Sequence, residues 1–203
     1  MTEEVAALSA AQGRPLVVIA ESDLNDPRVV TPRSGNGLGC DAQWSDDFHH
    51  AVHALLTGEV GGYYADFGST ADIAESLRHA YVYRGQRSEH RQRAHGRTAE
   101  GLTADRFLAY VQNHDQVGNR AVGDRIGASL SGDARRVAAA LMVLGPFVPM
   151  LFQGEEWNAS SPFPFFADHD DEALREAVRT GRRGEFASFG WDALGSWDAF
   201  DRV

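Results

Sequence analysis

Short apolar runs that lead directly into polar, carboxylate-bearing segments constrain the fold of this chain more than any other feature. The runs lie at 15–20, 107–112 and 148–152, and their length and β-branched or aromatic content are typical of buried strands. The carboxylates that follow them are Glu21, Asp115, Glu155 and Glu156. Helical patterns separate the runs, so the order of elements predicts an α/β fold with parallel strands. In such folds the carboxyl ends of the strands meet at one edge, where ligands bind.

The remaining elements follow from apolar periodicity and from capping residues. We expect helices at 2–11, 45–56, 69–83, 133–144 and 171–179, and a further short strand at 40–44. Ser45 is a suitable N-cap and Gly58 a suitable stop for the second of these helices. The segments 24–39 and 84–101 are rich in turn-forming or charged residues, so they predict irregular, exposed loops.

Length and charge narrow the possible architectures and partners. The chain has 203 residues, enough for one sizeable domain but fewer than the ~250 typical of a complete (β/α)8 barrel. Its net charge of −10 argues against a nucleic acid or an anionic membrane as the partner. No cysteine and histidine spacing resembles a zinc site, and we expect no metal.

The compartment follows from the cysteine and from the N-terminal residues. The single cysteine, Cys40, leaves no internal disulfide and fits a reducing compartment. The first residues lack the basic start and apolar run of a signal peptide, and no apolar segment approaches the ~18 residues that span a membrane. We therefore expect a cytoplasmic protein.

Two of the strand-end carboxylates have surroundings that would separate their pKa values. Glu21 directly follows an apolar run, and partial desolvation would raise its pKa towards the range of a general acid. Asp115 lies between His114 and Gln116, which would keep it ionised and able to stabilise positive charge. Such a pair suits acid-catalysed glycoside cleavage. A helix N-cap or an ion pair with Arg28 would also explain Glu21, and a tight turn would explain Asp115.

A second polar cluster follows the short strand at 40–44. Helix capping explains Asp46 and Asp47, whereas His49 and His50 are residues of the kind that bind sugar hydroxyls. Adjacent residues on a helix point in different directions, so the two histidines make a poor metal site. This cluster is therefore a candidate sugar-binding segment.

Four segments carry a resemblance to a known family: 21–28, 41–50, 112–120 and 149–157. The string Asn113-His114-Asp115 is similar to a motif shared across the alpha-amylase family of glycoside hydrolases. The longer strings, above all Asp46-Asp-Phe-His-His50, resemble the malto-oligosyltrehalose trehalohydrolase branch of that family. The similarity extends over nearly the whole chain, from about residue 15 to residue 191.

The resemblance implies a (β/α)8 barrel and a retaining mechanism without a redox or nucleotide cofactor. It implies that Glu21, at the end of the fifth barrel strand, is the general acid/base, and that Asp115, at the end of the seventh, stabilises the transition state. Residues expected to contact the malto-oligosaccharide substrate are Asp46, Asp47, His49, His50, His114, Gln116 and Asn119. The implied reaction hydrolyses the α-1,4 bond next to the terminal trehalose of maltooligosyl trehalose and releases trehalose.

One part of the family pattern has no counterpart in this sequence. The family nucleophile is an aspartate at the end of the fourth strand, roughly 30 residues before the acid, whereas 20 residues precede Glu21. We therefore expect residues 1–203 to form the C-terminal half of the catalytic barrel, about strands five to eight with their helices. Because such a half barrel has two open edges, we expect it to pair with an N-terminal half or with itself. Without the nucleophile, we expect the isolated chain to be inactive.

Two alternatives stay open at this point. The chain could belong to another enzyme of the alpha-amylase family, such as a glucan-branching or trehalose-forming transglycosylase. It could also be a non-catalytic half barrel that binds carbohydrate or is vestigial. The strings at 46–50 and 153–157 favour the hydrolase.

Overall fold

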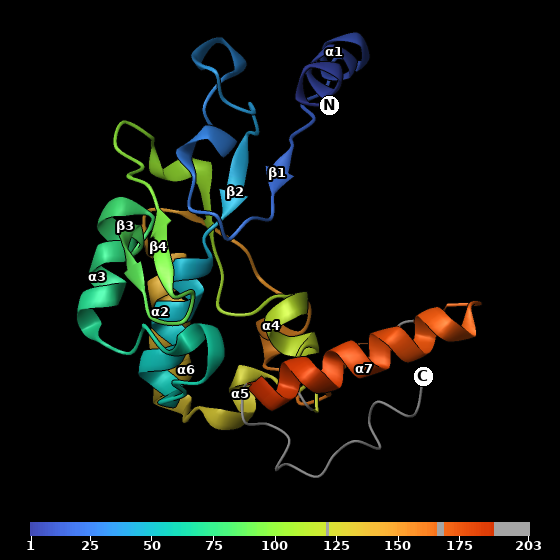
Figure 1. Cartoon of the computed structure of the whole chain (residues 1–203). Helices are drawn as coiled ribbons and strands as arrows, with labels where there is room; N and C mark the ends of the chain where they lie inside the picture. The colour runs from blue at the N-terminus through green and yellow to red at the C-terminus, as the bar shows by residue number, and fades with distance from the viewer. Residues whose placement is uncertain (121, 166–168, 189–203) are drawn as a thin grey trace.

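A computed structural model defines residues 1–120, 122–165 and 169–188 (Figure 1). Its central sheet consists of β1 (Ile19–Ala20), β2 (Ala42–Trp44), β5 (Phe107–Ala109) and β6 (Val148–Pro149). The strands are hydrogen-bonded in the order β1-β2-β5-β6, and every neighbouring pair is parallel. The sheet confirms the predicted α/β class.

The helices of the described residues differ greatly in length. They are α1 (Thr2–Gln12), α2 (Asp46–Thr57), α3 (Thr70–His79), α4 (His114–Gly118), α5 (Ile126–Ser129), α6 (Gly132–Val143) and α7 (Glu172–Ser188). Short 3-10 turns occur at Pro27–Val29, Arg33–Gly35, Gly62–Tyr64, Ala104–Arg106 and Glu155–Trp157. The helix α2 contacts α3, α6 and β5, whereas Figure 1 shows α1 standing apart beyond β1 and α7 extending away from α4 and α5.

The helix α2 begins and ends close to where the sequence predicts. Asp46 and Asp47 occupy its first turn, where negative charge is favourable, and Gly58 ends it with a left-handed φ of 75°. Ser45 precedes the helix, but its hydroxyl donates to the carbonyl of Ala80 at 3.1 Å instead of capping α2. This bond ties the start of α2 to the end of α3.

The core lies between the sheet and the helices α2, α3 and α6. Phe147, just before β6, meets Phe48 of α2 and Phe107 of β5 edge to face, with ring centroids 6.2 Å and 6.0 Å apart. All three side chains are buried, and each contributes about 1.5–3 kcal/mol by leaving water. This aromatic cluster anchors β5, the strand that leads into the segment around Asp115.

The helix α3 is shorter than predicted. It ends at His79, and Ala80 takes a positive φ of 64°. The reason is distant in sequence: the carboxylate of Asp47 accepts hydrogen bonds from the backbone nitrogens of Val82 and Tyr83, at 2.7 and 3.0 Å. Because the nitrogens of Val82 and Tyr83 donate to Asp47, these two residues do not continue the helix. The expectation that α3 continues to Tyr83 was wrong.

The segment 84–101 is not the irregular loop that its charge predicts. It contains an antiparallel hairpin of β3 (Arg84–Ser88) and β4 (Arg93–Gly96). The hairpin turn is organised by one carboxylate, that of Asp66. This carboxylate accepts from the backbone nitrogens of Glu89 and His90 at 3.0 and 3.2 Å. A side chain more than twenty residues upstream therefore determines a structure that local composition does not reveal.

The strands are shorter and more exposed than the apolar runs predict. Only residues 19–20 of the run at 15–20 pair with a neighbour, and Ile19 is 44% exposed. The prediction that this run is buried on both faces was wrong. Among the described residues β1 is paired on one side only.

At the C-terminal end, the helix predicted at 171–179 continues to Ser188 as α7. The short helices α4 and α5 were not predicted. Residues 189–203 lie outside the described residues. None of the helices in the described part of the chain has the length and apolar character needed to cross a bilayer.

Candidate active site

Two strand ends bring the predicted catalytic carboxylates together. Glu21 follows β1 directly, and Asp115 lies in α4, the short helix after β5. The N-cap of this helix is Asn113, whose side chain accepts from the backbone nitrogen of Gln116 at 2.9 Å. His114 lies between the carboxylates, with its Nε2 3.6 Å from Oε1 of Glu21 and 3.7 Å from Oδ1 of Asp115. One imidazole thus links two groups from distant parts of the chain.

The surroundings of Glu21 favour its protonated form. Partial burial raises its pKa above the usual value, His114 opposes this rise, and the neighbouring Asp115 adds to it. The ion pair that would have explained Glu21 structurally is absent from the described residues, because Arg28 instead binds Asp26 at 2.5 Å. The predicted direction of the Glu21 pKa is therefore confirmed.

A cleft of about 380 Å³ lies at these carboxylates. Its walls come from the end of β1, the start of α2, the helix α4, the turn at 62–64 and the hairpin turn. The lining residues are Glu21, Ser22, Asp23, Asp46, His50, Tyr63, His90, Arg91, Asp115, Gln116 and Asn119. Of the nine predicted site residues, six line the cleft, and His114 lies against two of them.

Asp46 is a cleft residue with an unusual charge state. Burial raises its pKa to about 7, although a hydrogen bond from the Tyr110 hydroxyl opposes the rise. Near neutral pH this carboxyl is therefore partly protonated, so it can donate as well as accept hydrogen bonds. Both properties suit a group that meets sugar hydroxyls.

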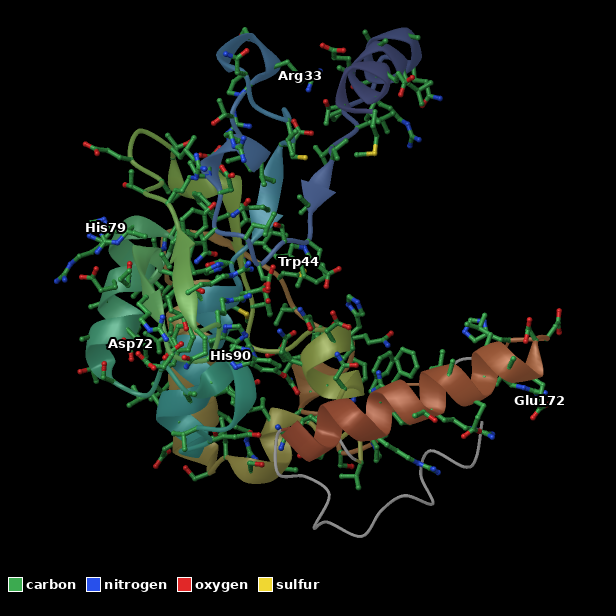
Figure 2. The ribbon with its side chains drawn as sticks, in the orientation of Figure 1. Arg33, Trp44, Asp72, His79, His90 and Glu172 are labelled. Atoms are coloured by element: carbon green, nitrogen blue, oxygen red, sulfur yellow. The ribbon has the colours of Figure 1, made fainter. Side chains whose placement is uncertain are left out.

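Aromatic rings define the cleft wall around His50. The His50 ring stacks on Tyr63 with centroids 4.9 Å apart, and burial lowers its pKa to about 3. The imidazole is therefore neutral at physiological pH. Trp44 lies at the C-terminal end of β2 and meets His114 edge on, with centroids 5.8 Å apart (Figure 2). Such surfaces commonly pack against the apolar faces of ligands.

Asp47 and His49 do not lie in the cleft, and our expectation that they contact substrate is corrected here. Both are buried, and their polar atoms bond to the protein itself. Besides the two backbone nitrogens beyond α3, Asp47 accepts from the side-chain amide of Asn25 at 2.7 Å. His49 bonds through Nδ1 to the carbonyl of Val111 at 2.8 Å and through Nε2 to the Tyr64 hydroxyl at 2.9 Å. Asp47 and His49 therefore stabilise the buried structure next to the cleft residues Asp46 and His50.

The hairpin turn contributes two cleft residues that the sequence analysis missed. Arg91 lines the cleft and pairs with Asp23 at 2.8 Å, and His90 lines the same cleft. Their charge had suggested a solvated loop. A basic cluster in an acidic chain was the one available signal, but nothing local indicated that it would fold over the carboxylates.

Glu21, His114 and Asp115 could in principle hold a cation. One ligand atom of each lies within 4.8 Å of the others. All three side chains are, however, about half exposed, and a protein cation site normally buries more oxygen ligands than two. The arrangement suits proton transfer and charge stabilisation better than metal binding.

The chain is similar over most of its length to several known proteins. The chain is 50% identical over 197 residues to a malto-oligosyltrehalose trehalohydrolase of Arthrobacter ramosus, covering 95% of this chain and 34% of the relative. A protein of the same name from Mycobacterium tuberculosis (strain ATCC 25618 / H37Rv) is 50% identical over 188 residues, covering 92% and 32%. The chain belongs to the malto-oligosyltrehalose trehalohydrolase family. A third member, from Saccharolobus solfataricus, is 50% identical over 169 residues, covering 83% and 30%.

The chain thus spans about a third of the length of these family members. It also superposes on the crystal structure of a "Putative alpha Amylase from Salmonella typhimurium" with a TM-score of 0.77 and 36% identity, covering 98% of this chain and 35% of that one. This similarity, together with the parallel sheet, confirms the predicted partial (β/α)8 barrel. No protein-family model matches the chain.

Proposed function

We propose that this chain supplies two catalytic groups of a retaining glycoside hydrolase that releases trehalose from maltooligosyl trehalose. The observation that carries the proposal is the arrangement of Glu21, His114 and Asp115 at the carboxyl edge of the sheet, beside an open cleft. The names of the relatives support the substrate class.

In this proposal Glu21 is the general acid/base. Its raised pKa lets it carry a proton to the glycosidic oxygen that leaves. After the sugar chain departs, the ionised carboxylate accepts a proton from the water that attacks the intermediate. Asp115 stabilises the positive charge that develops on the sugar ring, and the Nε2 atom of His114 lies 3.6 Å from the Glu21 carboxylate and 3.7 Å from that of Asp115.

A retaining mechanism also needs a carboxylate nucleophile. Two further carboxylates line the cleft, but neither suits this role. Asp46 is partly protonated and bound to the Tyr110 hydroxyl, and Asp23 is paired with Arg91. We infer that the nucleophile is supplied from outside this chain and that the chain alone does not turn over substrate.

Substrate contacts are assigned to the polar groups that remain available in the cleft. The Oε1 atom of Gln116 is buried and has no hydrogen-bond partner among the described residues, so a sugar hydroxyl would satisfy it. Asn119, Asp46 and His50 line the same space. The ring of Tyr63 adds an apolar surface beside them.

The sheet itself suggests the partner. Among the described residues β1 and β6 are each hydrogen-bonded to one neighbour only, and Val17, Ile19, Val148 and Leu151 are all more than 40% exposed. Unpaired edges of this kind bind further strands. We propose that residues 1–203 are the C-terminal half of a catalytic barrel and pair with an N-terminal half or with a second copy. A cytoplasmic location and the absence of nucleic-acid or membrane partners stay predictions.

The test is to assay free trehalose from maltotriosyl trehalose, using the chain alone and the chain mixed with the N-terminal part of a relative. We expect release only from the mixture, and loss of most of that release in Glu21→Gln. The matched control is Glu156→Gln, since Glu156 is exposed and outside the cleft. Clear turnover by the chain alone would refute the inferred external nucleophile.

The same assay separates the alternative functions. A mixture that transfers glucan chains without releasing trehalose would identify a transglycosylase. A mixture that binds the oligosaccharide but leaves it intact would identify a carbohydrate-binding protein.

A further inference from the structure

The helix α7 contacts the C-terminal end of α4 through Arg182. Arg182 donates through Nη1 to Oδ1 of Asn119 at 3.0 Å and through Nη2 to the carbonyl of Gly118 at 3.3 Å. Both partners lie at the C-terminal end of α4, the helix that carries Asp115. Arg182 therefore connects an element outside the sheet to the catalytic segment.

The Arg182 guanidinium is held on a second side. It lies over the ring of Phe165, 3.8 Å from the ring centroid. The backbone nitrogen of Phe165 in turn donates to the carbonyl of Gly118 at 3.0 Å. A planar guanidinium that is stacked and doubly hydrogen-bonded has little freedom to move.

Asn119 transmits this constraint to Asp115. Its side-chain Nδ2 lies 3.4 Å from Oδ1 of Asp115, and its backbone nitrogen donates to the Asp115 carbonyl at 2.8 Å. An asparagine amide can present either its oxygen or its nitrogen to a neighbour. Because a guanidinium only donates, Arg182 selects the amide oxygen for itself and leaves the NH2 group facing the Asp115 carboxylate.

We propose that Arg182 is a positioning residue, which orients the Asp115 carboxylate in the cleft through the side chain of Asn119. The proposal rests on the proposed function, because it assumes that Asp115 meets the reacting sugar. Arg182 itself does not line the cleft, so its role is indirect. Lysine in its place would keep the charge but lose the stacked, forked geometry.

The first test uses trehalose release by the chain mixed with the N-terminal part of a relative. We expect Arg182→Gln to lower kcat about tenfold and to change KM less than about twofold, because a misplaced catalytic group acts on the transition state more than on binding. Arg182→Lys should restore only part of the loss. The matched control is Arg175→Gln, since Arg175 lies on the same helix and pairs with Glu172.

A double-mutant cycle shows whether Arg182 acts through Asn119. If it does, Asn119→Ala combined with Arg182→Gln should lower kcat no more than Asn119→Ala alone. Additive losses in kcat would overturn the proposal, and so would an unchanged kcat in Arg182→Gln.

A third measurement needs no activity and so separates this proposal from the proposed function. The side-chain amide resonances of Asn119, followed by NMR in the chain alone, should move in Arg182→Gln and stay in place in Arg175→Gln. If Arg182→Gln melts like the unsubstituted chain and the Asn119 resonances do not move, the Arg182 proposal is refuted. Moved resonances without trehalose release from any mixture would refute the proposed function only.

Discussion

The Nε2 atom of His114 lies 3.6 Å from the Glu21 carboxylate, although the two residues come from different strand ends. The imidazole favours the ionised form of Glu21, while burial favours the protonated form and is the larger effect. His114 therefore adjusts the proton affinity of the proposed general acid.

Replacing His114 should raise the pKa of Glu21 further. In His114→Ala, burial and the Asp115 charge act on Glu21 without the opposing imidazole. The alkaline limb of the kcat/KM profile of the complemented barrel should move to higher pH, because that limb reports the loss of the acid proton. A limb that stays in place or moves to lower pH would contradict this role, and exposed His79 provides a control as His79→Ala.

Asp46 should make the chain less stable as the pH rises. Its pKa is about 7 in the folded state, against about 3.9 when unfolded. The native state therefore keeps a proton that the unfolded state gives up, and the contribution to the free energy of unfolding falls from about pH 4 to about pH 7. Asp46→Asn removes this dependence. Between pH 4 and pH 8, the free energy of unfolding of the variant should therefore rise by on the order of 3 kcal/mol relative to that of the unsubstituted chain.

Urea unfolding at the two pH values measures this difference. Asp133→Asn serves as the control, because Asp133 is highly exposed on α6 and pairs with the likewise exposed surface residue Arg136. Equal pH dependence in Asp46→Asn and the unsubstituted chain would exclude the buried carboxyl as its source.

His49 should have the opposite pH dependence. Burial keeps its pKa well below the usual value, so on acidification the unfolded state binds a proton that the native state does not. The stability contribution is complete above about pH 6.5 and falls below it, by about 1.4 kcal/mol per pH unit. His49→Phe should lose this pH dependence. The free energy of unfolding at pH 7 should also fall by about 2–4 kcal/mol, because the Val111 carbonyl and the Tyr64 hydroxyl lose their hydrogen-bond partner. Thermal melts at pH 5 and pH 7 would detect both effects.

Asp66 should control the hairpin that covers the cleft. Asp66→Ala removes the acceptor for the Glu89 and His90 backbone nitrogens, so these amides should exchange with solvent at least about tenfold faster. Arg91 follows them in the turn, and KM for the oligosaccharide should rise. The control Asp72→Ala removes a carboxylate from the N-terminal capping box of α3, where it accepts from the backbone nitrogens of Gly68 and Ser69. Unchanged exchange at Glu89 and His90 would show that the hairpin does not depend on Asp66.

The open sheet edge should mediate association. Ile19 lies on β1, which has one paired neighbour among the described residues. Ile19→Lys places a charge on this edge and should weaken pairing with an N-terminal half or with a second copy. Sedimentation velocity measures the loss of association. Val137→Lys is the comparison, because the Val137 side chain is exposed on α6. Equal association in both variants would place the interface elsewhere.

The sequence by itself determined those features that depend on neighbouring residues. Apolar runs followed by carboxylates located Glu21 and Asp115 at strand ends, and Gly13 and Gly58 stop their helices in the left-handed conformation that glycine adopts without strain. The family strings around Asn113 then indicated the kind of site. Each of these signals is contained within a few residues.

The tertiary structure decided which polar residues face the cleft and which support it. Asp47 and His49 belong to the same sequence cluster as Asp46 and His50, yet they are buried against partners that lie up to 62 positions away. Arg182 likewise meets Asn119 from 63 positions away. Hydrogen bonds over such separations depend on how the elements pack, and no periodicity or local motif in the sequence encodes them.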